Sequence, residues 1–230
     1  MYVPTTGVRA RVRAELTREI ADVARHHLAS DGAAALSLRA VARELGMASS
    51  AVYRYFPSRD DLITTLIVDA YDALGSAAEA AEARPPRDDL RGRWLAACRA
   101  VRAWAVAHPH EYALVYGSPV PGYAAPQATV GPASRVGLVL CRVVADALAA
   151  GVTDPGDAVD VLTPGLAANL DLPETTLTVR AVGAWTALFG LVNFELFGHT
   201  HNVVADHDRY FTQSANHLAD TLGLPEGTAR

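Results

Sequence analysis

The side chains best suited to bind a polyanion are concentrated in one stretch of the chain, Ser37 to Arg59. Serine and tyrosine hydroxyls and arginine guanidinium groups recur there, and these groups donate hydrogen bonds to phosphates and to the edges of bases. Elsewhere we find no Ser-His-Asp order, glycine-rich phosphate loop or paired-carboxylate motif of the kind that enzymes use. The sequence therefore favours nucleic-acid binding over catalysis.

Two short helices are expected to carry these side chains, with a sharp bend at Gly46 between them. Ser37 opens the first helix, and the second runs from about Ser49 to Tyr55 before Pro57 closes it. A chain that leaves one helix and enters another within about three residues usually needs a positive φ angle, which glycine adopts without steric cost. The pattern predicts a helix-turn-helix.

The apolar residues around the bend have the spacing that a tightly packed helix pair needs. Ala42 lies where the two helices cross, and Val52 fills the angle between them with Val41 and Leu45. An ordinary helical hairpin in a bundle would explain Gly46 and these apolar residues equally well. It would not explain why the second helix is so short and its exposed face so rich in Ser, Tyr and Arg. We therefore favour a helix that enters a major groove.

Through these residues the chain resembles a known family. Residues from about 11 to 74 are similar to the N-terminal domain of the TetR family of transcriptional regulators. The similarity lies in Ser-Leu-Arg-Ala-Val-Ala at 37–42, Leu-Gly at 45–46, Val-Tyr-Arg-Tyr-Phe-Pro at 52–57 and Ser-Arg-Asp-Asp-Leu at 58–62. Ala48 departs from the family, which usually has a serine there that caps the recognition helix. Ser49 is expected to take over that cap or to contact a phosphate.

The resemblance implies which residues bind DNA. They are Ser37 and Arg39 on phosphate or a base edge, Ser49, Ser50 and Ala51 facing base edges, Tyr53, Arg54 and Tyr55 against the DNA backbone or a guanine, and Arg59 on a phosphate at the start of the next helix. The arginines of residues 9–13 are candidates for further backbone or minor-groove contacts. Tyr53 could instead belong partly to the core, and Arg39 or Arg54 could be solvated charge.

The rest of the chain also reads as helical, because apolar residues recur every three to four positions and no strand-like alternation persists. We expect an all-α fold of nine to ten helices. The expected domains are a helix-turn-helix DNA-binding domain, 1–57, and a helical effector-binding and dimerisation domain, 58–230. The helix over 58–82 links the two, and Ser58 and Asp61 are expected to cap it reciprocally. A further helix is expected over about 155–169.

The last two long helices, near 174–197 and 206–222, are expected to form a four-helix bundle with a second copy, since helix-turn-helix dimers read two half-sites. The residues expected at that interface are Leu177, Ala181, Trp185, Leu188 and Val192 on the first helix and Phe211, Leu218 and Leu222 on the second. The alternative is that this stripe is internal core. Residues 181–195 also resemble the WHG type of C-terminal domain: Trp185 and Gly190 fit, while Phe189 replaces the histidine.

Several aromatic residues are candidates for an effector pocket, because few polar groups accompany them and an apolar or aromatic small molecule would fit. They are Trp94, Trp104, Tyr112, Tyr116, Phe189 and Phe194, although each such residue is more often core than a ligand contact. His199, His201 and His207 suggest a metal site, but they lie in a turn without Cys or carboxylate ligands at a convincing spacing. We therefore expect no metal and no cofactor.

Composition bounds the remaining possibilities. Half of the residues are hydrophobic and 20% are charged, and charged residues interrupt each apolar run before the roughly 18–20 residues that a membrane span needs. Residues 1–65 carry nine Arg against seven Asp and Glu, whereas the whole chain has a net charge of −5. Cys98 and Cys141 are expected to be small core residues in a reducing cytoplasm.

Together these observations predict a cytoplasmic homodimeric repressor of a pseudo-palindromic DNA operator. A small hydrophobic or aromatic effector is expected to release it, and no membrane partner is expected. Two alternatives stay open at this point. The chain could be a helical enzyme or small-molecule carrier that keeps the fold, or it could activate transcription instead of repressing it.

Overall fold

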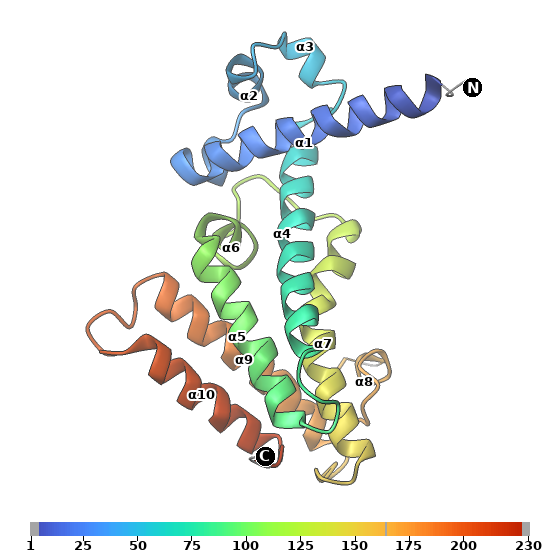
Figure 1. Cartoon of the computed structure of the whole chain (residues 1–230), viewed down its shortest axis with the longest axis vertical. Helices are drawn as coiled ribbons and strands as arrows, with labels where there is room; N and C mark the ends of the chain where they lie inside the picture. The colour runs from blue at the N-terminus through green and yellow to red at the C-terminus, as the bar shows by residue number, and fades with distance from the viewer. Residues whose placement is uncertain (1–4, 164, 227–230) are drawn as a thin grey trace. The chain divides into compact units, whose positions relative to one another are not determined.

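The computed structural model describes residues 5–163 and 165–226. These residues form ten α-helices and two short 3-10 helices, with no strand among them (Figure 1). The prediction of an all-α fold with nine to ten helices is confirmed. The α-helices are α1 (Thr5–Asp31), α2 (Leu38–Glu44), α3 (Ser49–Val52), α4 (Arg59–Glu82), α5 (Leu90–Ala107), α6 (Pro109–Tyr116), α7 (Val130–Ala149), α8 (Leu166–Asn169), α9 (Thr176–Leu196) and α10 (His207–Thr221). The 3-10 helices are η1 (Ala33–Ala35) and η2 (Gln127–Thr129).

Short polar side chains begin several helices by satisfying backbone N–H groups that have no partner in the first turn. At α5, an Asp89 carboxylate oxygen accepts a hydrogen bond of 2.8 Å from the Gly92 N–H. At α4, the Ser58 hydroxyl accepts one of 3.1 Å from the Asp61 N–H, as predicted. The reciprocal half of that cap differs, because the Asp61 carboxylate accepts from the Ser58 hydroxyl itself, at 2.7 Å.

Two predicted helices are shorter than the sequence suggested. Of the helix expected over 155–169, α8 is the only helical part among the residues described there, 155–163 and 165–169. Gly156 has a φ of 72°, and its N–H donates to the Asp154 carboxylate at 2.9 Å, which makes a turn there instead. The helix expected over 49–55 ends at Val52, and residues 53–55 continue it as turns. Helix ends are the least certain part of a pattern-based prediction.

Backbone contacts divide the chain into two compact units. The N-terminal unit comprises residues 1–70 and 110–130, and the C-terminal unit comprises residues 71–109 and 131–230. This division is one of compactness; the functional domain limits of 1–57 and 58–230 stay a prediction.

The core of the N-terminal unit is formed by one apolar face of each of its first four helices. Ile20 of α1, Val41 of α2, Val52 of α3, and Leu62 and Ile63 of α4 are fully buried. Each of these helices is amphipathic, so burying its apolar face directs the opposite face to solvent. The core thereby holds the outer face of α3 exposed.

The core of the C-terminal unit lies between α5, α9 and α10. Trp94 of α5 is buried, and its indole N–H donates to the Ala215 carbonyl of α10 at 3.1 Å. Leu188 and Val192 of α9 are fully buried as well. Large apolar side chains at helical spacing therefore hold these three helices together.

A buried charge cluster joins α4, α5 and α7 within the C-terminal unit. The fully buried Arg93 donates hydrogen bonds of 2.6 Å to Glu82 and to Asp146, and another of 3.0 Å to the Arg87 carbonyl. A buried guanidinium without such partners would be strongly destabilising. The cluster shows that this end of α4 is fastened in the C-terminal unit.

By length and composition alone, two helices could cross a membrane: α7 with the residues before it (Gln127–Ala149), and α9 (Thr176–Leu196). In α9, the charged Arg180 and Glu195 lie near the ends and leave the middle uncharged, so the sequence argument against a span was too strict. In each helix 39% of the apolar stretch is buried inside the structure. Core helices of soluble proteins pass the same test, which makes this weak evidence for a membrane.

Candidate nucleic-acid interface

The bend between α2 and α3 has the geometry that the sequence predicted. Gly46 adopts a φ of 63°, in the left-handed region that favours glycine. Ala42, where the two helices cross, is buried, and so are Val41 and Val52. The Met47 N–H donates back to the Ala42 carbonyl at 2.9 Å, which closes the end of α2. The local sequence therefore sets the angle between the two helices.

The outer face of α3 is polar and open to solvent. Ser49 and Ser50 are exposed, and Tyr53, just after the helix, keeps 41% of its surface exposed. Arg54 is also exposed, whereas Ala51 is half-buried. These side chains offer hydroxyl, guanidinium and methyl groups on one surface, which are the groups that read base edges and bind phosphates.

The predicted contacts on α2 lie at the N-terminal end of that helix. Arg39 is exposed, and Ser37 is the N-cap residue, half-buried and without a side-chain capping bond. At α3 the N-cap residue is Ala48, which cannot cap with its side chain. The prediction that Ser49 replaces the missing cap is therefore wrong, because Ser49 is already the first residue of the helix. Its hydroxyl remains available for the other predicted role, a phosphate contact.

Arg13 ties α1 to the residues that follow α3. Its guanidinium donates a 3.0 Å hydrogen bond to the Arg54 carbonyl and lies over the ring of Tyr55, 5.2 Å from the ring centre. A guanidinium over an aromatic face is attracted by the partial negative charge that the ring's quadrupole places on that face. Tyr55 is half-buried, so the structure gives it a role in holding α1 against this segment in addition to the predicted DNA contact.

Arg59 does not project from the surface as the prediction of a phosphate contact requires. Its Nε donates to the Leu36 carbonyl at 3.1 Å, and its Nη2 donates to the carbonyls of Ala33 and Ala34 at 2.8 and 3.2 Å. These carbonyls belong to η1 and the residue after it, just before α2. Since Nε and Nη2 donate to backbone acceptors, Arg59 fastens the start of α4 to the segment before α2, which argues against the predicted phosphate contact.

A second cluster in the N-terminal unit links α1 to α4 and α6. Arg25 donates to Asp69 of α4 at 2.5 Å, and its Nε lies 3.7 Å from the Glu111 carboxylate of α6. The hydroxyls of Thr64 and Tyr123 are 2.9 Å apart and join α4 to the segment after α6. The sequence offered no signal for these pairs, because their partners lie more than 40 positions apart.

The aromatic residues predicted to line an effector pocket fall into different environments. Trp94 and Trp104 are buried in the C-terminal unit, and the Trp104 ring stacks on His108 with 4.9 Å between centres. Phe189 is buried and packs edge to face with Trp185, at 6.1 Å. Phe194, by contrast, is 58% exposed, so it lines no interior pocket. Its predicted role as a ligand contact stays a prediction.

Tyr112 differs from the other predicted aromatic residues in the state of its hydroxyl group. It is fully buried, its hydroxyl has no hydrogen-bond partner among the described residues, and burial raises its pKa. The ring of Tyr116, half-buried, lies 5.0 Å away. A buried hydroxyl without a partner is unfavourable by roughly 1–3 kcal/mol. Tyr112 is therefore positioned to bond a polar group that is not part of the described chain.

Most residues predicted for dimerisation face the interior of their own unit. Those that are buried are Leu177, Ala181, Leu188 and Val192 of α9 and Phe211 and Leu222 near α10. Trp185 and Leu218 are half-buried. The structure thus assigns the predicted stripe mainly to internal core, the alternative that the sequence left open, because α9 and α10 pack on α5 along this face.

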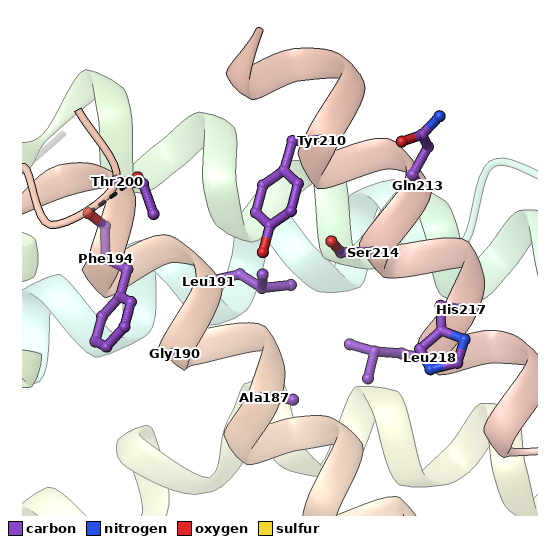
Figure 2. Close-up of a pocket in the computed structure, with 10 residues that line it drawn as sticks. All are labelled: Ala187, Gly190, Leu191, Phe194, Thr200, Tyr210, Gln213, Ser214, His217 and Leu218. Atoms are coloured by element: carbon purple, nitrogen blue, oxygen red, sulfur yellow. Dashed lines mark hydrogen bonds between the residues drawn. The ribbon is translucent and has the colours of Figure 1, made fainter. Parts of the chain in front are cut away.

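A neighbouring face of α9 and α10, which includes Leu218, forms a shallow apolar groove of about 580 Å³ (Figure 2). In Figure 2 the Tyr210 ring of α10 points toward Leu191 of α9. Gly190 adds to the openness of the groove, since nothing lies within 4 Å of the position that a Cβ would take there. The groove is lined by Ala187, Gly190, Leu191, Phe194, Thr200, Tyr210, Gln213, Ser214, His217 and Leu218.

The histidines of the α9–α10 turn make contacts that need no metal. The His207 ring nitrogen Nε2 lies 3.1 Å from the Thr200 hydroxyl, and the His199 ring lies 5.1 Å from that of Phe194. Within residues 5–163 and 165–226, no group of three or more His, Cys, Asp or Glu side chains is arranged to hold a metal ion.

Two family models match the chain. One is described as "Bacterial regulatory proteins, tetR family" and matches residues 20–66, which include α2, α3 and the bend at Gly46. The other is described as "Tetracyclin repressor-like, C-terminal domain" and matches residues 94–218.

Similar proteins agree with these matches along nearly the whole chain. The HTH-type transcriptional regulator Rv1816 of Mycobacterium tuberculosis is 39% identical over 204 residues. The matched region covers 84% of this chain and 85% of the length of Rv1816. Among solved structures, a protein described as regulatory, SCO4313, is 34% identical, with a TM-score of 0.72 over 95% of this chain and 100% of that one. A protein of unknown function from Rhodococcus sp. RHA1 is 25% identical, with a TM-score of 0.68 over 90% and 93%.

Proposed function

The chain belongs to the TetR family of transcriptional regulators, and from this premise we propose that it is a homodimeric repressor that a small ligand releases from a pseudo-palindromic operator. The family comprises helix-turn-helix DNA-binding regulators and is not enzymatic. Our proposal includes a cytoplasmic location, a DNA-binding domain over 1–57, an effector and dimerisation domain over 58–230, and a C-terminal domain of the WHG type.

The observation that carries the proposal is the exposed polar face of α3. Ser49, Ser50 and Tyr53 are open to solvent, while the apolar side of the same turn, at Val52, is completely buried. A major groove is about 12 Å wide and admits one helix. Since the bend at Gly46 leaves α3 projecting with its polar side outward, a major groove is the surface that it fits best.

The proposed DNA contacts follow from what each group can donate. Ser50 and Ala51 face base edges, where the Ala51 methyl group would meet a thymine methyl. The Tyr53 hydroxyl and the exposed guanidinium of Arg54 bind phosphates, which position the protein without reading sequence. Ser37, Arg39 and Ser49 are proposed as further phosphate or base contacts, and Tyr55 as a backbone contact held in place by Arg13.

We propose that the groove between α9 and α10 binds the same groove of a second copy. Phe194 and Tyr210 are 58% and 43% exposed there, which is unusual for large aromatic residues of a monomer. A two-fold axis would pair each copy's α9 and α10 into a four-helix bundle, and such symmetry suits an operator with two half-sites. The proposed interface shares Leu218 with the predicted one, whose other residues, apart from the half-buried Trp185, are buried in the chain's own core.

The effector is proposed to be a small, mainly apolar or aromatic molecule with one polar group. The unpaired Tyr112 hydroxyl is the group that would bind it, with Tyr116 beside it. Glu111, next to Tyr112 on α6, pairs with Arg25 of α1. A ligand that displaces α6 would therefore disturb the helix that Arg13 ties to the DNA-reading segment. Differential binding of this kind shifts the population away from the DNA-bound form.

A gel-shift experiment tests the proposal. Purified protein is titrated onto DNA from the flank of its own gene at low salt, beside the variants Ser50→Asp and Ser118→Asp. Both serines are exposed, so both variants should fold, and both add one negative charge. Binding by the wild type and by Ser118→Asp but not by Ser50→Asp supports the proposal. Absence of DNA binding by the wild-type protein would refute the proposal.

A further inference from the structure

The groove between α9 and α10 is lined by residues that recur along one side of each helix. Tyr210 and His217 of α10 are seven residues apart, and so are Ala187 and Phe194 of α9. Residues seven apart lie on the same side of a helix, about two turns from each other. In Figure 2, His217 lies at the opposite end of the groove from Phe194. Its side chain is exposed in the single chain, and the second copy in the proposed dimer would cover it.

The lining of this groove carries almost no ionisable groups. None of its ten residues is Asp, Glu, Lys or Arg, and the ionisable ones are Tyr210 and His217. Between about pH 5 and pH 8 a phenol ordinarily stays neutral, whereas an imidazole ordinarily changes its charge. His217 is therefore the lining residue that can place a charge in the groove within this range.

The carboxylates of α9 and α10 are already paired with arginines of α5. The two helices contain three acidic residues. The pairs are Glu195 and Asp208 with Arg102, at 2.7 Å each, and Asp220 with Arg91, at 2.5 Å. A protonated His217 would therefore bring a positive charge into the groove without a free counter-ion on either helix.

The remaining charged or titratable groups of the two helices, apart from Tyr210, are basic. Arg180 of α9 donates to the carbonyls of Thr221 and Asp154, at 3.1 and 2.8 Å. Arg209 of α10 is exposed, and His207 begins that helix with its Nε2 3.1 Å from the Thr200 hydroxyl. None of these groups can form an ion pair with an imidazolium.

We propose that His217 makes the dimer sensitive to acid, because the second copy covers the neutral imidazole and protonation of the ring opposes association. The inference rests on the proposed function, since it takes the α9–α10 groove to be the dimer interface. Burying a charge without a partner is strongly unfavourable. By two-fold symmetry each dimer covers two His217 rings, so at a pH where the free chains are protonated its formation releases two protons. Because two joined reading heads bind the two half-sites, acid should also release the DNA.

The pH dependence of dimerisation tests the inference without DNA. Sedimentation velocity gives the dissociation constant of the dimer at constant ionic strength, from about pH 8 to about pH 5, in buffers with EDTA to remove metal ions. For the wild type this constant should rise at least about tenfold between about pH 7 and about pH 5.5. Its steepest rise is limited to about 100-fold per pH unit, the value for two protons per dimer. Circular dichroism at each pH checks that the chain stays folded.

Two histidine variants locate the effect. His217→Gln keeps a polar side chain that stays neutral, so its dimer should match the wild type at about pH 8 and hold nearly the same dissociation constant down to about pH 5. His201→Gln removes an exposed histidine of the α9–α10 turn that does not line the groove, and it should keep the wild-type pH dependence.

Three results would overturn the inference: a wild-type dimer that does not respond to pH, an equal rise of the dissociation constant in His217→Gln, or a lost pH dependence in His201→Gln. A wild type that is monomeric even at about pH 8 would instead refute the proposed dimer, and the acid sensitivity with it.

Discussion

Replacing Arg59 with alanine should weaken folding without removing a DNA contact. The guanidinium holds three backbone carbonyls, those of Ala33, Ala34 and Leu36, between 2.8 and 3.2 Å. A hydrogen bond from a charged donor contributes roughly 1.5–3 kcal/mol when its acceptor has no alternative partner. Leu36 is buried, whereas Ala34 is exposed and its carbonyl can bind water instead. We therefore expect a net loss of about 2–3 kcal/mol.

For a chain of this size, such a loss lowers the melting temperature by about 5–10 °C if unfolding is cooperative. The change is measured by circular dichroism, and the salt slope of DNA binding is measured well below the transition. Arg59→Ala should keep the wild-type salt slope. Arg39→Ala is the matched control, because Arg39 is exposed on α2 and proposed to contact DNA. It should melt like the wild type and bind with a slope lower by about 0.9.

The opposite pattern would refute this reasoning. If Arg59→Ala melted like the wild type and lost about 0.9 from its salt slope, the guanidinium would have to leave the carbonyls and bind a phosphate. Arg59→Lys adds a check on geometry, since it keeps the charge but cannot bond several carbonyls at once. It should recover only a minor part of the lost melting temperature.

Three further predictions concern the C-terminal unit. Leu191→Glu should raise the dissociation constant of the dimer by about 100-fold or more, because it buries an unpaired carboxylate. Light scattering measures this, with the exposed Val203→Glu as control. An unchanged dimer in Leu191→Glu would contradict the prediction. Leu188→Ala should lower the free energy of unfolding, measured in urea, by about 2–5 kcal/mol. It should leave the dimer intact, since Leu188 is fully buried within its own chain. Dissociation of the dimer without a loss of unfolding free energy would contradict this. The Arg135 guanidinium lowers the pKa of Glu79, so Glu79 stabilises the fold above the pKa it has when unfolded, and this contribution is lost as the pH falls through the lower folded pKa. Glu79→Gln should therefore be less stable than the wild type by about 0.5–1 kcal/mol at neutral pH, a gap that closes in acid; a gap independent of pH would argue against the ion pair.

The helix-turn-helix could be predicted from the sequence because its determinants are local. Gly46 needs its positive φ, and Ala42 and Val52 need burial, for reasons that involve only residues within one bend. The polar outer face of α3 follows from the same periodicity. Local sequence and local structure agree here, which is why pattern reasoning succeeds.

Roles that depend on distant partners could not be predicted in this way. Arg59 occupies the position of a phosphate contact in the sequence pattern, yet its donors reach carbonyls more than 20 residues earlier. Likewise, nothing near Arg25 indicates that Asp69 and Glu111 will meet it. Such pairs are set by tertiary packing, which periodicity does not encode.

The dimer surface shows a different limit. Helix α9 has two apolar faces, one carrying Leu188 and Val192 and the other carrying Ala187 and Leu191. Hydrophobic periodicity finds both faces but does not say which packs on the chain's own core. Only the position of α5 decides that the first face is internal. The helix expected over 155–169 failed for a local reason, the turn at Gly156, which an apolar count overlooks.

Selection of binding sites from random DNA tests most directly whether α3 reads DNA as half of a symmetric pair. Purified wild-type protein should enrich an inverted repeat whose half-site centres lie about 34–36 Å apart or a multiple of that. Ala51→Asn should enrich different bases at defined positions of each half-site while keeping the spacing. Enrichment of no sequence by the wild type, or of the same repeat by both proteins, would contradict the assignment of α3 as the reading helix.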